Sequence, residues 1–219
     1  MEFKKKRQNR AQQTEETRTK IIQAALDEFS RHGYGGANIR SIAARAGVNH
    51  GLIKYHFNGK EMLWRKSVEY MFRRSNEEIS IDQEVTTLEG VKELIRRYTR
   101  YCARHPEHAR IMIQASMHDR EILQWALEQH LLPNRDRLVE AIRKEQAGGI
   151  WPQVSEVSLI YIIVSACQLI FALAAEANIL YGVNVQDDAF VDQHAEAIIT
   201  LFFDHIVKGP ATLTAGPSA

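Results

Sequence analysis

Apolar residues recur at helical spacing along almost all of this 219-residue chain, and this regularity restricts the fold more than any other feature. Ile21, Ala25 and Phe29 lie four apart on one face of an expected helix, which the pair His32-Gly33 ends. Between residues 60 and 208 the periodicity continues without a convincing strand pattern or internal repeat. The sequence therefore predicts an all-α fold.

Two short helices follow the first one. Asn38 is a good N-cap for a helix that Gly47 ends, and Asn49 caps the next helix, whose Ile53 and Phe57 share one face. A longer helix is expected to begin near Lys60, after the turn at Asn58-Gly59. A helix, a tight glycine turn and a second helix make a helix-turn-helix, whose second helix enters the major groove of DNA.

The rest of the chain reads as further helices with breaks at turn-forming residues. We expect breaks at Asp82 to Thr86, His105-Pro106, Pro133, Gly148 to Pro152 and Gly182 to Asp188. The most apolar run, Leu159 to Ala175, contains Ser165 and Gln168 and is shorter than the about 20 residues of a membrane span, so a buried helix is expected. Residues 209–219 are small and polar and predict a disordered tail.

Charge divides the chain into a basic head and an acidic body. Residues 1–65 hold thirteen Lys or Arg against six Asp or Glu, a net +7, and residues 66–219 hold fifteen against twenty-one, a net −6. This asymmetry indicates that only the head meets a polyanion. Two separated cysteines, Cys102 and Cys167, and the lack of an apolar segment after the basic N-terminus favour a reducing cytoplasmic location.

The second helix of the motif has a face suited to DNA. With Ile53 and Phe57 turned inward, side chains of the opposite face are available for phosphates and base edges, and Leu52 for a thymine methyl group. Arg40 and Lys60 flank this face. Asn49 and Gly51 also have simpler interpretations as a cap and a tolerated glycine, and His56 as a packing residue. The predicted DNA-contact residues are Arg40, Asn49, His50, Gly51, Leu52, Lys54, Tyr55 and Lys60.

Residues 17–63 resemble the DNA-binding domain of TetR/AcrR-type transcriptional repressors. The resemblance rests on the runs AAL-x-x-F at Ala24 to Phe29 and IA-x-x-AGV at Ile42 to Val48, and on Gly33-Tyr34, Gly51, Phe57 and Lys60-Glu61. Lys54 and Ala37 depart from the tyrosine and the threonine or serine that the family often has there.

The resemblance implies a homodimeric repressor of a palindromic DNA operator, with a helical body that dimerises and holds a small-molecule effector. The expected regions are a flexible basic arm at 1–16, the helix-turn-helix domain at 17–64, the effector-binding and dimerisation domain at 65–208 and the tail at 209–219. Lys4, Lys5, Lys6, Arg7 and Arg10 either stay solvated or bind the adjoining minor groove.

Two expected helices, Ser155 to Tyr181 and Asp188 to Val207, are apolar over a wider arc than a monomer needs, which favours a four-helix dimer interface. The alternative is that they form the core of the monomer. The residues that define this arc are Ile163, Cys167, Ile170 and Phe171 on the first helix and Ile198, Leu201, Phe202 and Phe203 on the second.

Effector contacts are expected from large or lightly polar residues of the body, although core packing explains each of them alone. Enzymatic function has little support, because no nucleophile motif or phosphate-binding loop is present, and Pro106 makes zinc binding by His105 and His108 improbable. We therefore expect no cofactor and no metal. An architectural DNA binder without an effector remains the second hypothesis. The candidate effector residues are Tyr98, Tyr101, Cys102, Met112, Gln114, Met117, His118, Trp125, Gln168 and Phe171.

Overall fold

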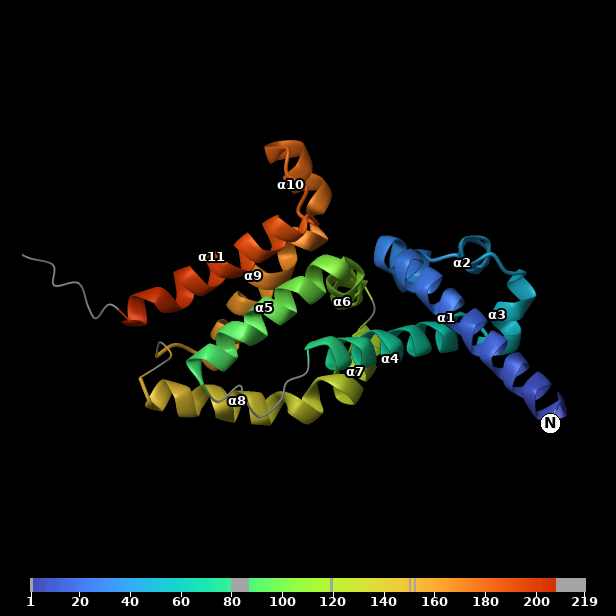
Figure 1. The fold of residues 1–219 in the computed structure, drawn as a ribbon, viewed down its shortest axis with the longest axis horizontal. Coiled ribbons are helices and arrows are strands. Elements are labelled where there is room, and N and C mark those ends of the chain that lie inside the picture. The colour runs from blue at the N-terminus through green and yellow to red at the C-terminus, as the bar shows by residue number, and fades with distance from the viewer. Residues whose placement is uncertain (1, 80–86, 119, 150, 152, 208–219) are drawn as a thin grey trace, which may run out of the picture. The chain divides into compact units, whose positions relative to one another are not determined.

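The computed structural model describes residues 2–79, 87–118, 120–149, 151 and 153–207, and the regular structure in these ranges is entirely α-helical (Figure 1). This confirms the predicted fold class. The expected tail at 209–219 and the expected break at Asp82 to Thr86 lie outside the described residues. The helices are α1 (Glu2–Gly36), α2 (Ile39–Ala46), α3 (His50–Phe57), α4 (Lys60–Ile79), α5 (Leu88–Arg104), α6 (Pro106–His118), α7 (Arg120–His130), α8 (Leu132–Ala147), α9 (Glu156–Ala172), α10 (Ala174–Tyr181) and α11 (Asp188–Val207).

The chain forms two compact units, which are described separately. Unit 1 comprises Met1–Glu78 and Pro106–Arg135, and unit 2 comprises the described residues of Ile79–His105 and Asp136–Ala219. In unit 1, α1, α2 and α3 share one apolar core with α4, α6 and α7. The helix-turn-helix region is thus supported by α6, α7 and the part of α4 that extends beyond the expected domain at 17–64.

Helix α1 differs from the sequence expectation at its beginning. Residues 2–16 were expected to form a flexible arm, whereas the structure begins α1 at Glu2. Neither glycine nor proline occurs between residues 2 and 32, and the Lys, Arg, Gln and Glu of this segment all favour a helix. The predicted end is confirmed, because Gly33 has non-helical backbone angles of φ 66° and ψ 176°.

The turns of the helix-turn-helix form as their capping residues predict. The Asn38 side chain accepts a hydrogen bond from the backbone N–H of Arg40, and Asn49 accepts one from Gly51, both at 2.8 Å. Gly47 ends α2 in the left-handed conformation at φ 66°. Local sequence therefore determines where α2 and α3 begin and where α2 ends.

In unit 2, ion pairs and apolar contacts join α5 to α11. Arg96 pairs with Glu196 at 2.6 Å, and Arg100 pairs with Asp192 at 2.9 Å. The hydrogen bonds of Glu196 raise the pKa of Arg96, and those of Arg96 lower the pKa of Glu196.

The prediction of one continuous helix from Ser155 to Tyr181 is wrong. The helix breaks at Leu173 into α9 and α10, which are bent by 71°. Neither glycine nor proline marks this break, so local sequence carried no signal for it. Within the described ranges, no single helix has the length and apolar character that a membrane span requires.

The interpretation of Leu159 to Ala175 as a buried helix also needs correction, because one face of α9 is exposed. Half of the residues that defined the expected dimer arc lie in the monomer core instead: Cys167, Phe171, Ile198 and Phe203 are at most 4% exposed. Ile163, Ile170 and Phe202 are half-buried, and only Leu201 is strongly exposed. The periodicity predicts that these helices are apolar all round but does not say which face turns inward. The exposed apolar residues of α9 are Val157, Tyr161, Ile162 and Leu169.

Candidate nucleic-acid interface

Helix α3 has one buried and one exposed face. Ile53 and Phe57 are each 1% exposed, whereas Tyr55 is 80% exposed and Lys54 also lies at the surface. His50 and Gly51 begin the exposed face, and Leu52 at its margin is 38% exposed. The predicted orientation of α3 is confirmed, while contact of these residues with DNA stays a prediction.

The C-terminal end of α3 is attached to α1 through Arg18. The guanidinium of Arg18 donates to the backbone oxygen of His56 at 3.5 Å and lies 5.2 Å from the Phe57 ring centre. His56 is half-buried beside this ring, as its packing interpretation predicts. Burial, and secondarily the charge of Arg18, lowers the pKa of His56. This ring therefore favours its neutral form and contributes packing within unit 1.

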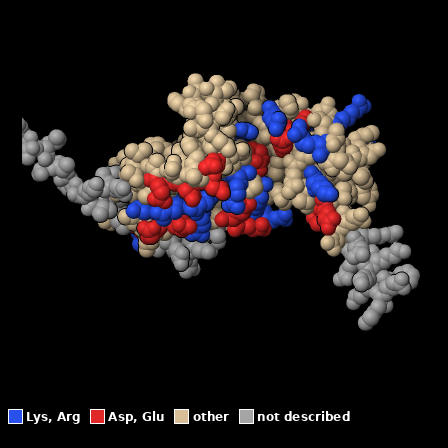
Figure 2. Space-filling view, turned by 45° about the horizontal axis from the view of Figure 1, so that its top comes forward, with Lys and Arg blue, Asp and Glu red and all other residues tan. Residues whose placement is uncertain are grey.

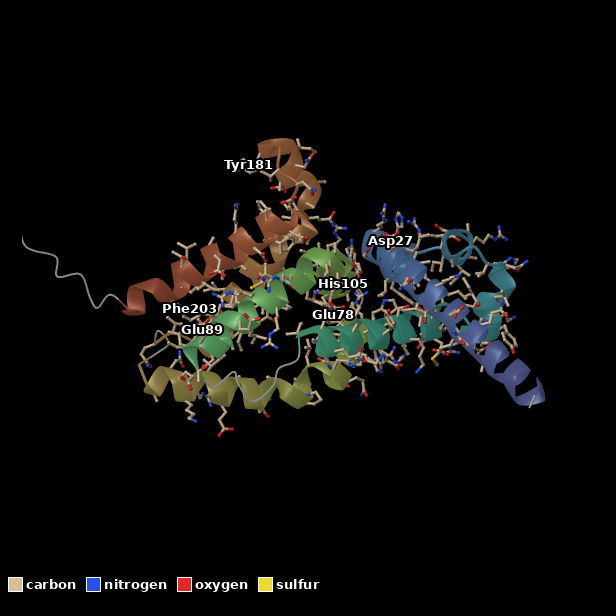
Figure 3. The ribbon with its side chains drawn as sticks, viewed as in Figure 1. Asp27, Glu78, Glu89, His105, Tyr181 and Phe203 are labelled. Carbon is tan, nitrogen blue, oxygen red and sulfur yellow. The ribbon has the colours of Figure 1, made fainter. Side chains whose placement is uncertain are left out.

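A buried carboxylate connects α1 to the start of α2. Glu28 is 3% exposed and accepts hydrogen bonds from the backbone N–H of Asn38 at 3.1 Å and from the hydroxyl of Ser41 at 2.9 Å. The neighbouring Asp27 (Figure 3) pairs with Arg45 of α2. These residues position α2, the first helix of the motif, and sequence reasoning missed them. The available signal was a carboxylate inside the apolar stripe of α1.

Lys60 and Arg40 differ in their surroundings. The ammonium group of Lys60 donates to the backbone oxygen of Gly35 at 3.0 Å and lies 5.1 Å from the centre of the Tyr34 ring. This lysine therefore joins the start of α4 to the end of α1, a role that the sequence did not predict. Arg40 is exposed in the first turn of α2, where a phosphate can reach it.

Asn49 and Gly51 form one local unit. The Asn49 side chain accepts the N–H of Gly51, and a Cβ atom at position 51 would lie 3.3 Å from that side-chain oxygen. A larger residue at position 51 would therefore press on the cap. This contact explains a glycine at position 51 without any approach to DNA. It is a third interpretation, besides the DNA contact and the tolerated glycine that the sequence left open.

Five of the candidate effector residues lie in unit 2. Tyr101, Cys102 and Phe171 are at most 5% exposed, and the Tyr98 hydroxyl donates to the side-chain oxygen of Gln168 at 3.0 Å. Burial raises the pKa of Tyr98 and of Cys102, and it raises the pKa of Cys167 to about 11. The two thiols therefore stay protonated near neutral pH, and inert packing describes them better than nucleophilic chemistry.

The other five candidate effector residues lie in unit 1. Gln114 borders a cavity of about 10 Å³ beside Gly33, which has room for about one water molecule. Trp125 is half-buried against Trp64, with ring centres 5.7 Å apart, and Met112 also packs against the core. Met117 is 71% exposed and His118 is also exposed, so these two do not line the core of unit 1.

Comparison with known proteins agrees with this geometry. The family described as "Bacterial regulatory proteins, tetR family" matches residues 21–65, and the family described as "Tetracyclin repressor-like, C-terminal domain" matches residues 88–201. The HTH-type transcriptional repressor SCO4008 of Streptomyces coelicolor is 31% identical over 168 residues, which are 77% of this chain and 80% of that protein.

Two further comparisons cover different extents. The HTH-type transcriptional repressor NicS of Pseudomonas putida is 32% identical over 111 residues, and the match spans 50% of this chain and about half of that protein (52%). A crystal structure of a mutant of HlyIIR shares the fold with a TM-score of 0.61 at 22% identity, covering 87% of this chain and 98% of that one. The family members are transcriptional regulators rather than enzymes. With its exposed α3 face and both matching regions, the chain belongs to the TetR family of DNA-binding transcriptional regulators.

Proposed function

We propose that the protein is a repressor that binds a palindromic operator as a homodimer and is released by a small-molecule effector. The exposed face of α3 on a fixed helix-turn-helix carries this proposal. Lys54 and Arg40 neutralise phosphates, while His50 and Tyr55 hydrogen-bond to phosphates or base edges. Leu52 contacts a thymine methyl group. A protein bound to this operator lies at the nucleoid, in the cytoplasm.

Dimerisation uses exposed apolar residues of α9 and α11. Tyr161, Ile162 and Val157 are more than half exposed on α9, and Leu201 is 75% exposed on α11. A two-fold interface from these helices would remove their apolar surface from water. Two recognition helices about 34–36 Å apart then meet successive major grooves, which explains why the proposed operator is palindromic.

The effector site is proposed among Tyr98, Tyr101, Cys102, Gln168 and Phe171 of unit 2. This cluster is apolar except for a few neutral polar groups, which is typical of a small-molecule site. A ligand entering it would replace the hydrogen bond between Tyr98 and Gln168 with its own. The candidates of unit 1, with Gln114 first, are the second location, because a larger ligand there needs the water-sized cavity to open.

The test begins with selection of bound duplexes from a random pool and footprinting of the selected sequence. We expect a two-fold symmetric footprint, with binding weakened by Tyr161→Asp, which places a charge in the proposed dimer interface. Dimerisation is measured in parallel by sedimentation. Equal affinity for all duplexes would instead support the architectural hypothesis. A wild-type protein that stays monomeric on its operator would rule out the proposed dimer.

A further inference from the structure

Helix α10 lacks the packing that a short helix needs. It has eight residues, none of which is buried. Ile179, Leu180 and Tyr181 are 81%, 62% and 76% exposed, and Tyr181 stands clear at the end of the helix (Figure 3). An isolated helix of this length is unstable in water, and most helices in proteins are stabilised by burying an apolar face. Ala174 and Ala177 pack against the apolar cluster of unit 2, but the described part of a single copy leaves the large apolar side chains of α10 uncovered.

A groove lies beside this helix. It has a volume of about 570 Å³ and is bounded by the C-terminal half of α9, by α10 and by the start of α11. Two contacts maintain its walls: the Asn178 side chain donates to the backbone oxygen of Val183 at 3.4 Å, and a ring nitrogen of His194 lies 2.8 Å from the backbone oxygen of Ala166. Leu169, Ile170, Leu173, Val183 and Phe190 make most of its lining apolar.

The lack of positive charge on α9, α10 and α11 limits the kind of partner that can bind the groove. Neither lysine nor arginine occurs from Glu145 to Val207, and the projection formed by α10 is largely uncharged in Figure 2. A surface without cations does not attract nucleic acid or an anionic membrane. Another protein surface is the remaining macromolecular occupant.

The exposed apolar area approaches the requirement of a dimer. At about 150–250 Å² for each fully exposed aromatic side chain and less for each aliphatic one, the exposed parts of α9, α10 and α11 amount to several hundred Å² per copy. A stable interface buries about 800 Å² per partner, and the largest apolar patch of a typical monomer is about 300–600 Å². The exposed residues behind this estimate are Val157, Tyr161, Ile162, Leu169, Leu173, Ile179, Leu180, Tyr181 and Leu201.

We propose that α10 of one copy lies in the α9–α10–α11 groove of a second copy, and that the exchange is reciprocal. The inference rests on the dimer of the proposed function and extends its interface beyond α9 and α11. Protrusion and groove belong to the same chain, so a two-fold axis pairs each α10 with the groove of the other copy. The apolar face of α9 continues through Leu169 and Leu173 into this groove, which makes the two contacts one surface.

Two variants separate the two sides of this contact. The arm variant combines Ile179→Ser with Leu180→Ser, and the groove variant is Leu173→Arg, which places a charge in the apolar groove. All three positions are exposed in the single copy, so the monomer fold should persist, which circular dichroism verifies. Met62→Ser is the matched control, because Met62 is 44% exposed, as Leu173 is, but lies in unit 1.

Sedimentation at serial dilutions measures the dimer dissociation constant. We expect each variant to raise it by at least about tenfold and the control to leave it unchanged. A mixture of the arm and groove variants forms heterodimers with one intact arm–groove pair, whereas neither homodimer has any. The heterodimer should therefore exceed its statistical share in the mixture.

The outcomes distinguish this proposal from the proposed function. If the arm variant dimerises as the wild type does, the proposed exchange of α10 is wrong, but the dimer of the proposed function is not. The groove would then bind a small molecule or another protein. Weakened variants that form no excess heterodimer show that α10 packs elsewhere and also overturn it. Tyr161→Asp tests the α9 interface independently, and a wild-type monomer at all concentrations removes both proposals.

Discussion

Two lysines near the proposed DNA surface have different expected effects. Lys54 is exposed on α3, whereas the ammonium group of Lys60 bonds to the Gly35 backbone oxygen. Lys54→Ala should weaken binding to every duplex and reduce the slope of log affinity against log salt by about 0.9. Lys60→Ala should instead lower the free energy of unfolding by about 1 kcal/mol, with a smaller change in slope. Anisotropy titrations and urea unfolding measure the two effects, and an unchanged slope for Lys54→Ala would remove this residue from the interface.

His130 gives unit 1 a dependence on pH. Its Nε2 atom is buried and has no hydrogen-bond partner among the described residues, and its ring is stacked on Phe72 with ring centres 4.6 Å apart. Burial lowers the pKa of His130 below the 6.5 expected for the unfolded chain, so the unfolded state takes up protons first as the pH falls. The contribution of neutral His130 to the free energy of unfolding is therefore fully present above pH 6.5 and decreases as the pH falls below it.

The variant His130→Phe tests this dependence. It removes the unpaired nitrogen, so we expect stability at pH 7 to be unchanged or higher by up to about 1 kcal/mol. The decline in thermal midpoint between pH 7.5 and pH 5.5 should also become shallower. Identical pH profiles for the variant and the wild type would contradict the assignment. The pKa of His56 is lowered in the same direction, so His56 adds to the decline.

At the scale of elements, the connection between α1 and α2 depends on Glu28. Glu28→Ala would leave the N–H of Asn38 and the hydroxyl of Ser41 without this acceptor, so we expect a loss of about 2–3 kcal/mol in the free energy of unfolding. The control is Glu61→Ala, because Glu61 is largely exposed in its pair with Arg65 and should lose under about 0.5 kcal/mol. Urea unfolding compares the two. Equal small losses would show that α2 is positioned without the Glu28 contacts.

At the scale of the whole molecule, effector and operator binding are linked. If an effector lowers operator affinity by some factor, the operator must lower effector affinity by the same factor. Calorimetric titration of the effector, with and without a saturating operator duplex, measures this factor. A ligand of unit 2 whose affinity is identical in both titrations would not be the releasing effector.

Local sequence determined most of the helices and the exposed face of α3. Apolar spacing indicates the helices, and Asn38, Gly47 and Asn49 set the ends of α2 and α3 through contacts within a few residues. These interactions form wherever the segment folds as a helix. For this reason they could be predicted from residue order alone.

Tertiary structure decided the features that depend on residues far apart in the chain. Lys60 bonds to a backbone oxygen 25 residues earlier, and Glu28 accepts from groups 10 and 13 residues later. The inward face of α9 follows from packing against α5 and α11, which periodicity alone does not specify, because a helix that is apolar all round has no marked inner side. The break at Leu173 likewise has no signal in the local sequence.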